Sequence, residues 1–412
     1  MNSARATSLA DAATILERCD DLAGLSSQPE RLERVYLSPE HTAANELVAQ
    51  WMREAALSTW QDAAGNQCGR RDGTVDDLPA LVLGSHIDTV PDAGRYDGML
   101  GVLIAIQVAH RLRDTELPFA LEVVAFGDEE GTRFGTALLG SRAFAGTWDE
   151  AWWELDDERG ITLGEAFIDF GLDPARLPGA YRRPESLAGY LEVHIEQGPL
   201  LEDADRRLGV VTSIAGARRF ELTMTGKAGH AGTPYELRRD ALVGASELVQ
   251  AVERISIERG VIGTVGKLEA FPGGVNVIPG RVEFSLDLRA DTDRARDEAV
   301  QEIEESAREI ALYRGLGFNS VEIYRADAVE CDPRLRAAIE TGIRSTGDDS
   351  PMPIWSRAGH DGMAVVAATP IAMLFLRCEG GVSHHPDEAV TAEDVAAAVD
   401  AFEAAVLALA VA

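Results

Sequence analysis

The chain has 412 residues, of which 46% are hydrophobic and 26% are charged, as in an ordinary globular protein. This length favours two domains over one. The 69 acidic and 38 basic residues give a net charge of -31, which argues against binding to nucleic acid or to an anionic membrane surface. Four scattered cysteines and the lack of any long apolar run predict a cytoplasmic protein without disulfide framework or membrane span.

The first half of the chain alternates helix and strand patterns. Residues 1–20 are polar and helical in pattern, without the apolar stretch of a signal peptide. Ser38 and Pro39 open an amphipathic helix at 39–56, and residues 98–112 form a strongly apolar helix. Continuous apolar runs predict buried strands at 79–85, 119–126 and 189–195. Such alternation predicts an α/β sheet with parallel members.

The middle of the chain follows a different pattern. Alternating or apolar runs predict strands at 218–225, 261–270, 281–289 and 320–324, with helices at 240–259 and 292–313. The order β-α-β-β-α-β is typical of the ferredoxin-like motif. We therefore predict an inserted domain at 212–328, within a catalytic domain formed by 1–211 and 329–412. In that second part the α/β pattern returns, with a strand at 371–376 and a helix from 392 onward.

Four short segments rich in acidic residues and histidines lie at or near predicted strand ends. In chain order they are His86-Ile87-Asp88 with Asp97 soon after, Asp128-Glu129-Glu130, Glu192-Val193-His194, and Ser383-His384-His385. Sites in open α/β sheets form at the carboxyl edge of the strands. Together the four segments offer ligands for two divalent metals that share a carboxylate, with a spare glutamate as base. That combination indicates a metal-dependent hydrolase of amide-type bonds.

Each segment alone also has an ordinary structural explanation. Asp97 stands where a helix N-cap is favoured, and His194 can be read as a satisfied core histidine. Three carboxylates directly after the apolar run that ends at Phe126 are nevertheless costly unless cations neutralise them. On an extended segment His86 and Asp88 face the same side, so Asp88 can accept the second ring N–H of His86 and fix its tautomer.

Two further segments have the residue types of a substrate-binding site. One is Gly229-His230-Ala231-Gly232, and the other is Asn276-Val277-Ile278-Pro279-Gly280, which precedes the strand carrying Arg289. A histidine, an asparagine and an arginine can together bind a carboxylate and a polarised oxygen. The ordinary alternatives are a hairpin turn at Gly229-His230 and a surface ion pair between Arg289 and Asp287.

Taken together, these motifs resemble the M20-type metallohydrolases, in the branch of N-carbamoyl-L-amino acid hydrolases, β-ureidopropionases and allantoate amidohydrolases. The resemblance runs from about residue 36 to about residue 390. Its motifs are Ser85-His86-Ile87-Asp88-Thr89-Val90, Asp97-Gly98, Glu129-Glu130-Gly131-Thr132-Arg133-Phe134, His194-Ile195-Glu196-Gln197-Gly198-Pro199, Gly229-His230-Ala231-Gly232-Thr233, Asn276-Val277-Ile278-Pro279-Gly280, Ala358-Gly359-His360-Asp361 and Ser383-His384. His194 is typical of this branch, because the peptidase branch has an acidic residue there.

The resemblance implies a mixed-sheet α/β catalytic domain that holds two metal ions, with an inserted ferredoxin-like α+β domain that acts as a lid and forms a homodimer. The other subunit would contribute to the site. One ion would be held by His86, Asp97 and His194, and the other by Asp97, Glu130 and His384. Glu129 would be the general base and Asp88 would orient His86. The substrate would be bound by Gln197, His230, Asn276, Arg289 and His360, with Arg289 pairing with its carboxylate.

The implied reaction is hydrolysis of a ureido or N-carbamoyl C–N bond in a small carboxylate substrate, with release of ammonia and carbon dioxide. Allantoate is the preferred substrate, because the sequences at 60–66 and 263–268 look most like those of an allantoate amidohydrolase. The alternatives are an N-carbamoyl-L-amino acid hydrolase and a β-ureidopropionase. Zinc or manganese is expected, with cobalt or nickel also suited to these ligands. A shortened segment at 230–238 and Arg357, where glycine is common, depart from the family pattern and bear on the substrate.

Overall fold

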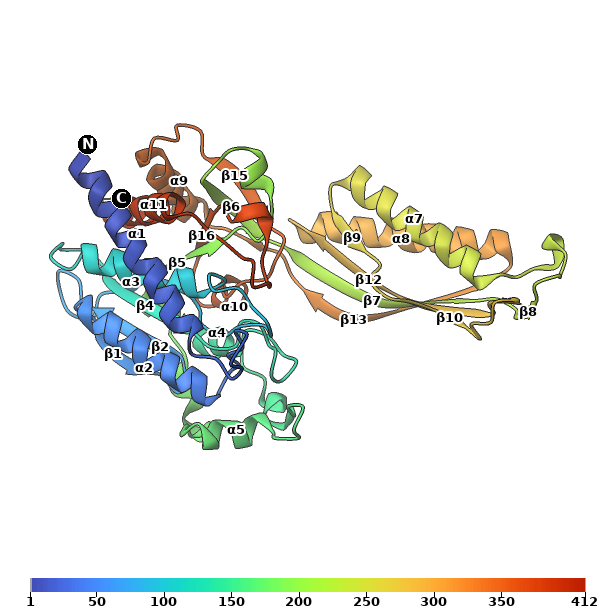
Figure 1. Ribbon diagram of the computed structural model, residues 1–412, viewed down its shortest axis with the longest axis horizontal. Helices are drawn as coiled ribbons and strands as arrows, with labels where there is room; N and C mark the ends of the chain where they lie inside the picture. Colours follow the sequence, from blue (N-terminus) through green and yellow to red (C-terminus); the bar gives the residue numbers. More distant parts are fainter. Residues whose placement is uncertain (1, 412) are drawn as a thin grey trace. The chain divides into compact units, whose positions relative to one another are not determined.

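The computed structural model of the protein describes residues 2–411. Met1 and Ala412, at the two ends of the predicted catalytic domain, lie outside the described residues. The chain folds into two compact units (Figure 1). The first unit contains the chain up to Thr212, Cys331–Ile354 and the chain from Ala358 onward, and the second contains Ser213–Glu330 and Trp355–Arg357.

A mixed sheet runs through the first unit in the order β1-β2-β4-β3-β5-β16-β6, and β15 also pairs with β6. The strands are β1 (Ser58–Gln61), β2 (Gln67–Arg71), β3 (Ala80–His86), β4 (Ala120–Phe126), β5 (Leu187–Ile195), β6 (Leu208–Ile214), β15 (Met352–Ser356) and β16 (Ile371–Leu376). Neighbours among β4, β3, β5 and β16 are parallel, whereas β1, β2 and β6 pair antiparallel. The predicted mixed α/β class is confirmed.

The parallel strands are aligned so that their carboxyl ends meet. All residues of β3 and β4 are buried, as their continuous apolar sequences predict. His86 is level with Phe126 in the β3–β4 pairing, and Gly84 is level with Glu192 in the β3–β5 pairing. Two residues beyond that second pair stand His86 and His194. The segments that follow β3 and β4 therefore leave the sheet at one edge, next to the end of β5.

The first unit also contains helices. They are α1 (Asn2–Ala23), α2 (Pro39–Glu54), α3 (Met99–Arg111), α4 (Leu139–Ala145), α5 (Leu163–Asp169), α6 (Leu200–Asp203), α9 (Pro333–Ser345), α10 (Gly362–Val365) and α11 (Ala392–Ala410), with 3-10 turns η1 (Glu150–Glu154), η2 (Pro174–Ala180), η3 (Pro184–Ser186) and η5 (Glu379–Gly381). The apolar α3 packs on β3, β4 and β5, and α1 packs on α3 and α11. Ser38 accepts a hydrogen bond from the backbone of His41 and Pro39 follows it, which explains where α2 begins.

The second unit is an antiparallel sheet with two helices. Its elements are β7 (Gly216–Thr225), β8 (Gly229–His230), η4 (Tyr235–Leu237), α7 (Ala241–Arg259), β9 (Ile262–Thr264), β10 (Leu268–Phe271), β11 (Val277–Ile278), β12 (Arg281–Ala290), α8 (Asp293–Arg314), β13 (Gly317–Ala326) and β14 (Val329–Glu330). The sheet order is β10-β12-β7-β13, β9 also pairs with β12, and β8 pairs with β11. Side by side in Figure 1, α7 and α8 run along this sheet and contact it.

The strand predicted at 261–270 is in fact two strands, β9 and β10, which both pair with β12. From Thr264 to Leu268 the chain advances four residues, while β12 advances only three from Phe284 to Asp287. The extra residue is the signature of a β-bulge, which interrupts the ladder. Lys267 fills the gap, since its backbone N–H donates to the Ser285 hydroxyl at 3.0 Å.

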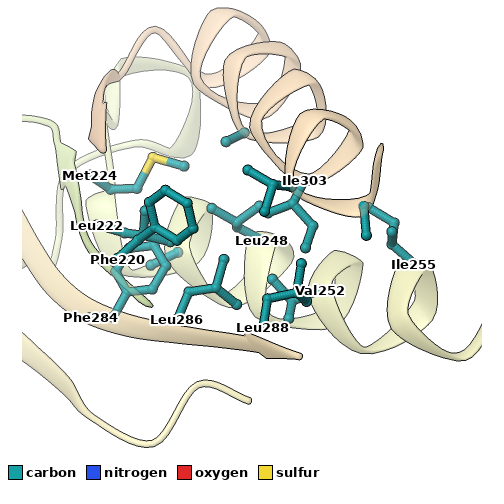
Figure 2. Packing of buried hydrophobic residues seen from close by; sticks show 14 of the residues in the cluster. Phe220, Leu222, Met224, Leu248, Val252, Ile255, Phe284, Leu286, Leu288 and Ile303 are labelled. Carbon is teal, nitrogen blue, oxygen red and sulfur yellow. The ribbon is translucent and has the colours of Figure 1, made fainter. Parts of the chain in front are cut away.

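The core of the second unit lies between the sheet and the two helices (Figure 2). Its larger side chains come from β7, α7, β12 and α8: Phe220, Leu222, Met224, Leu248, Val252, Ile255, Phe284, Leu286, Leu288 and Ile303. The inward residues of β12 alternate with outward polar ones, as the strict alternation in its sequence predicts.

Two features of the described residues concern the setting of the protein. The four cysteines are all free thiols, and all are buried. Among residues 2–411 there is no helix that combines the length and the apolar character needed to cross a bilayer.

Candidate metal centre

The ligand candidates of the first unit gather at the carboxyl edge of its parallel strands. They are His86 at the end of β3, Asp97 two residues before α3, Glu129 and Glu130 after β4, His194 near the end of β5, and His384 in the loop between η5 and α11. All belong to the first unit.

Asp97 lies at the centre of this group. Its Oδ1 is 3.0 Å from His194 Nε2 and 3.6 Å from His86 Nε2, while its Oδ2 is 3.1 Å from His384 Nε2. The side chain does not cap α3, whose N-cap residue is Gly98. Because the two carboxylate oxygens face different imidazoles, Asp97 has the geometry of a carboxylate that bridges two cations.

The histidine rings are oriented by carbonyl groups on their far side. His86 Nδ1 is 3.1 Å from the backbone oxygen of Asp88, and His194 Nδ1 is 2.9 Å from the backbone oxygen of Ile195. When Nδ1–H donates to a carbonyl, Nε2 is the nitrogen left to face Asp97, and it does so in both rings. The two imidazoles are therefore oriented so that Nε2 can bind a metal ion once its proton is displaced.

The Asp88 carboxylate does more than the sequence predicts. Its Oδ1 lies 3.5 Å from His86 Nδ1, farther than the Asp88 carbonyl, so the ring is oriented mainly by the backbone. The same carboxylate accepts the backbone N–H groups of Glu129 at 2.9 Å and Glu130 at 3.1 Å. Asp88 thus joins the segment after β3 to the acidic segment after β4, where Glu130 Oε1 lies 3.4 Å from His384 Nε2.

The electrostatics of the group show an excess of buried negative charge. Burial raises the pKa of Glu129 well above its ordinary value and that of Glu130 to about 7, and neighbouring carboxylates add to both shifts. Burial opposes the charge of Asp97 as well, but hydrogen bonds from the histidines lower its pKa well below the usual range. The same carboxylate is the main reason that the pKa of His384 rises to about 9.

This donor set fits divalent metal ions. Among the described residues, four groups of three have ligand atoms within 4.8 Å of one another, and two of them are the sets His86, Asp97, His194 and Asp97, Glu130, His384. A cation would neutralise the carboxylates and replace the protons on the imidazoles, because metal ligands must be deprotonated. Imidazole mixed with carboxylate suits zinc, manganese, cobalt or nickel.

The other two groups reuse some of these residues. One is His86, Glu129 and Glu130, and the other is Glu192, His194 and His360. Glu192 already accepts hydrogen bonds from the hydroxyls of Ser85 at 2.9 Å and Tyr190 at 3.1 Å. It is therefore a satisfied buried carboxylate beside the centre.

Three residues with left-handed backbone lie in the segments that form the centre. Asp128, Gln197 and His384 have positive φ angles of 66°, 55° and 55°. Side chains other than glycine populate this left-handed region sparsely, and they persist there only where surrounding contacts impose it. The fold holds these three segments in conformations that the chain would not adopt by itself.

Two of the predicted substrate residues lie next to the centre. Gln197 Nε2 donates to Asp97 Oδ2 at 2.9 Å and to Ser383 Oγ at 3.2 Å, while its Oε1 is buried with no hydrogen-bond partner among the described residues. His360 is buried and its ring edge meets His194, with ring centroids 4.5 Å apart. Burial lowers the pKa of His360 well below its ordinary value, so this ring is neutral.

The other three predicted substrate residues belong to the second unit, where they do not come together. His230 and Asn276 are neighbours, because the Ala231 N–H donates to the Asn276 carbonyl at 2.9 Å and β8 pairs with β11. They follow β7 and precede β12, whereas Arg289 is near the far end of β12, by β9 (Figure 1). The eight residue steps from Arg281 to Arg289 separate the two ends by roughly 26 Å at about 3.3 Å per residue.

Arg289 also forms the ion pair that the sequence leaves open. Its Nε donates to Asp287 Oδ1 at 2.8 Å, and its Nη1 donates to the Arg357 carbonyl at 2.8 Å. A third contact joins Nη2 to Asp287 Oδ2 at 3.5 Å. A guanidinium has five N–H donors, so two remain after these three contacts.

Arg34 is a supporting residue that sequence reasoning missed. It is completely buried, and its guanidinium donates to the backbone oxygens of Ile87 at 2.7 Å, Leu22 at 2.6 Å and Leu25 at 3.0 Å. Ile87 lies between His86 and Asp88, so this arginine fixes the backbone of the segment that carries the proposed ligand His86. A lone arginine before a predicted helix carries no sequence signal for such a role.

Glu388 and Ser383 were also unassigned, although Ser383 belongs to a quoted motif and Glu388 follows four residues after His384. Glu388 accepts the backbone N–H groups of Tyr96 at 2.7 Å and Asp97 at 3.1 Å. Ser383 Oγ lies 2.8 Å from Asp97 Oδ2 and 3.1 Å from Glu388 Oε2. His385, in contrast, turns to its own loop, where its Nδ1 accepts the Asp387 N–H at 3.2 Å.

Comparison with known proteins identifies the family of the chain. The family described as "Peptidase family M20/M25/M40" matches residues 82–408. An N-carbamoyl-L-amino acid amidohydrolase of Geobacillus stearothermophilus is 41% identical over 92% of this chain and 94% of its own length. A probable allantoate deiminase of Oryza sativa subsp. japonica is 39% identical over 92% of this chain and 85% of its own length.

The fold has close counterparts among solved structures. The crystal structure of an amidase of the hydantoinase/carbamoylase family from Burkholderia multivorans superposes with a TM-score of 0.89 and 34% identity, over 97% of this chain and 98% of that chain. With the family match covering most of the sequence and the histidines and carboxylates gathered at one sheet edge, the chain belongs to the M20 family of metal-dependent hydrolases, among its hydantoinase/carbamoylase-type amidases.

Proposed function

We propose that this protein hydrolyses a ureido or N-carbamoyl C–N bond in a small carboxylate substrate, with allantoate as the preferred substrate. N-carbamoyl-L-amino acids and N-carbamoyl-β-alanine are the alternatives. Relatives named as N-carbamoyl-L-amino acid amidohydrolases and as allantoate deiminases are similarly close, which supports the bond type more strongly than the substrate. The native metal is proposed to be zinc or manganese, with cobalt or nickel as alternatives.

The observation that carries the proposal is the position of Asp97. Its Oδ1 faces the imidazoles of His86 and His194 and its Oδ2 faces that of His384, at 3.0 to 3.6 Å, and Glu130 completes the second set. Two ions bound in this way would lower the pKa of a water molecule toward neutrality and polarise the carbonyl of the substrate.

Glu129 is the proposed general base and acid. It lies next to Glu130 but is not needed for either of the two predicted ligand sets, so its carboxylate stays available for proton transfer. Its raised pKa, caused by burial, suits a group that takes a proton from water and returns it to the leaving nitrogen. Asp88 supports this role, since it fixes the backbone of Glu129.

The substrate contacts are proposed to come from two copies of the chain. Arg289, with two N–H donors remaining, would pair with the substrate carboxylate, and the free Oε1 of Gln197 would accept from the ureido nitrogen. His230 and Asn276 lie roughly 26 Å from Arg289 within one chain, so a small molecule cannot touch both groups of one copy. This separation supports a homodimer through the second unit, with each copy supplying one of the groups.

Subunit exchange tests the two-copy arrangement. H230A and R289A homodimers should each have low activity, but an equal mixture that has exchanged subunits should recover up to about one quarter of the wild-type rate, because half of its dimers are mixed. In a mixed dimer one site receives both intact groups and the other receives neither. If His230 and Arg289 served the same site from one copy, the mixture would recover nothing.

Substrate identity is tested with the metal-reconstituted protein, by ammonia release from the ureido substrates and by chromatography of the free amino acids released from the control compounds. The panel is allantoate, several N-carbamoyl-L-amino acids and N-carbamoyl-β-alanine, with an N-acetyl amino acid and a dipeptide as controls for aminoacylase and peptidase activity. We expect turnover of ureido substrates only, with allantoate highest. Turnover of the dipeptide or the N-acetyl compound alone would refute the proposed bond type, and no turnover at all would favour a non-catalytic binding protein.

A further inference from the structure

Glu388 is a buried carboxylate that the proposed chemistry does not use. Glu388 is 4% exposed, and both of its carboxylate oxygens have hydrogen-bond partners. Oε1 accepts the N–H groups of Tyr96 and Asp97, while Oε2 lies 3.1 Å from the Ser383 hydroxyl. No arginine, lysine or histidine within residues 2–411 forms an ion pair with it. Burying a carboxylate without a cation is costly, so such a group is expected to have a specific task.

The contacts of Glu388 join two segments that are distant in sequence. The Tyr96-Asp97 backbone carries the central carboxylate, and Ser383 directly precedes His384. Ser383 also touches the central carboxylate itself, at 2.8 Å from Asp97 Oδ2. A hydroxyl has one hydrogen, so Ser383 can donate either to Asp97 or to Glu388. When a cation takes up Asp97 Oδ2, Glu388 remains as the acceptor that keeps Ser383 in place.

The two proposed metal positions differ in how firmly their ligands are anchored. His86 and His194 belong to buried strands, and each ring is fixed by a backbone carbonyl. His384 lies in a loop with a left-handed backbone, and its side chain is 47% exposed. No such ring-to-carbonyl contact is present for His384 among the described hydrogen bonds. Its placement therefore depends on the neighbouring Ser383 and on Glu388.

The loop before Asp97 closes tightly over Glu388. A Cβ atom added to Gly94 would lie 2.4 Å from the Cβ, Cδ and Oε1 atoms of Glu388. No real side chain tolerates such a contact, so glycine is what allows this loop to pass over the carboxylate. The pocket around Glu388 is therefore shaped to hold this side chain in one position.

We propose that Glu388 is a positioning residue that fixes the spacing between Asp97 and His384 and so sets the affinity of the metal position formed by Asp97, Glu130 and His384. The position formed by His86, Asp97 and His194 depends on it much less. This inference rests on the proposed two-metal function, because it needs two positions that share Asp97.

The test is a metal titration of the apo protein with Zn²⁺ or Mn²⁺, followed by calorimetry or by competition with a chelator. Wild-type protein should bind two ions per chain. E388A should keep one ion at nearly wild-type affinity and bind the second about 10- to 100-fold more weakly, the range typical for loss of a group that supports a ligand. E388Q should restore the second ion, because its amide oxygen can accept from Tyr96 and Asp97 while its NH₂ group donates to Ser383.

A matched control is Asp62, another buried carboxylate of the first unit. It accepts the N–H groups of Ala64 and Asn66 in a turn and contacts none of the proposed ligands. D62A should lower thermal stability without changing either metal affinity. S383A provides a second variant should E388A fail to fold, and it should weaken the second ion selectively as well.

The outcomes separate the two proposals. If wild-type protein binds two ions and E388A binds both as tightly, the role of Glu388 is wrong while the two-metal function stands. Equal weakening of both ions, or failure of E388Q to restore the second, would make Glu388 a general structural residue. Binding of only one ion by wild-type protein would overturn both the two-metal function and this inference.

Discussion

The two units of the chain place polar chemistry in opposite ways. At the carboxyl edge of β3, β4 and β5, charged and histidine side chains touch one another, and His86, Asp97 and His194 among them are buried. In the second unit the buried cluster is apolar throughout, and its candidate functional residues lie at the ends of the sheet. The carboxyl ends of parallel strands lie at one edge of a sheet, so the polar residues that follow them come together. In the antiparallel sheet of the second unit, the candidate residues at its two ends are kept apart by the length of the strands. Charge-directed changes should therefore affect function in the first unit, and packing changes should affect stability in the second.

The largest effect should come from the proposed base. E129Q should lower kcat roughly 10²- to 10⁴-fold, the contribution of general acid–base catalysis, because glutamine cannot take the proton from water. The bound metal content, measured by elemental analysis, should be that of the wild type, since Glu129 is not needed for either predicted set. Retained turnover would remove Glu129 from the role of base.

The core of the second unit should respond to a packing change alone. Leu248 of α7 is completely buried in the apolar cluster (Figure 2), so L248A should cost about 2 to 5 kcal/mol of unfolding free energy in denaturant titration. Metal stoichiometry should not change. Ile257, on the same helix but 75% exposed, is the matched control, and I257A should stay within about 0.5 kcal/mol of wild type in the monomer. Loss of metal in L248A would contradict the expectation that packing changes in the second unit affect stability and not the metal centre.

Arg289 should affect binding of the substrate more than turnover. R289A removes a charge-assisted hydrogen bond of about 1.5 to 3 kcal/mol, which corresponds to a KM increase of roughly 10- to 100-fold. Metal content and melting temperature should change little, because Asp287 keeps Arg219 as a partner at 2.7 Å. An unchanged KM for carboxylate substrates would leave Arg289 with only the ion pair to Asp287.

The smallest expected effect concerns His41, a buried histidine of the first unit. Burial lowers its pKa from 6.5 to about 4. The unfolded chain therefore binds the proton first as the pH falls, and the stabilisation present above pH 6.5 is lost progressively toward pH 4. Between pH 6.5 and 5, wild-type protein should lose about 1.5 kcal/mol more stability than H41Q. A difference between the two that does not change with pH would contradict this.

Much of the fold follows from the sequence because apolar runs and helix signals are local. The runs that end at Ser85 and Phe126 become fully buried strands, and Ser38 with Pro39 starts a helix as its capping chemistry predicts. The hairpin of β1 and β2 was not predicted from the sequence, because its strands are short and carry polar residues such as Gln61 and Gln67. Its position at the sheet is set by pairing with β4, which is a tertiary contact.

The same distinction applies to the site. The proposed ligands could be picked out because they stand in short motifs at or near strand ends: His86, Asp97, Glu130, His194 and His384. Arg34 and the contacts of Glu388 were not readable, since their partners are backbone groups brought near by folding. The separation of His230 from Arg289 could not be inferred either, because it depends on the direction of β12 in the sheet.

The buried Arg34 has a practical consequence for shortened versions of the protein. The family match begins at residue 82, which invites removal of everything before it. Yet the guanidinium of Arg34 ties the carbonyls at the end of α1, Leu22 and Leu25, to Ile87 between two residues of the metal centre. A protein trimmed to the matched region would keep all five proposed ligands, but it would lose Arg34 and with it the contact that supports the segment next to His86. The first helix and the segment after it belong to the minimal enzyme, although no chemistry takes place there.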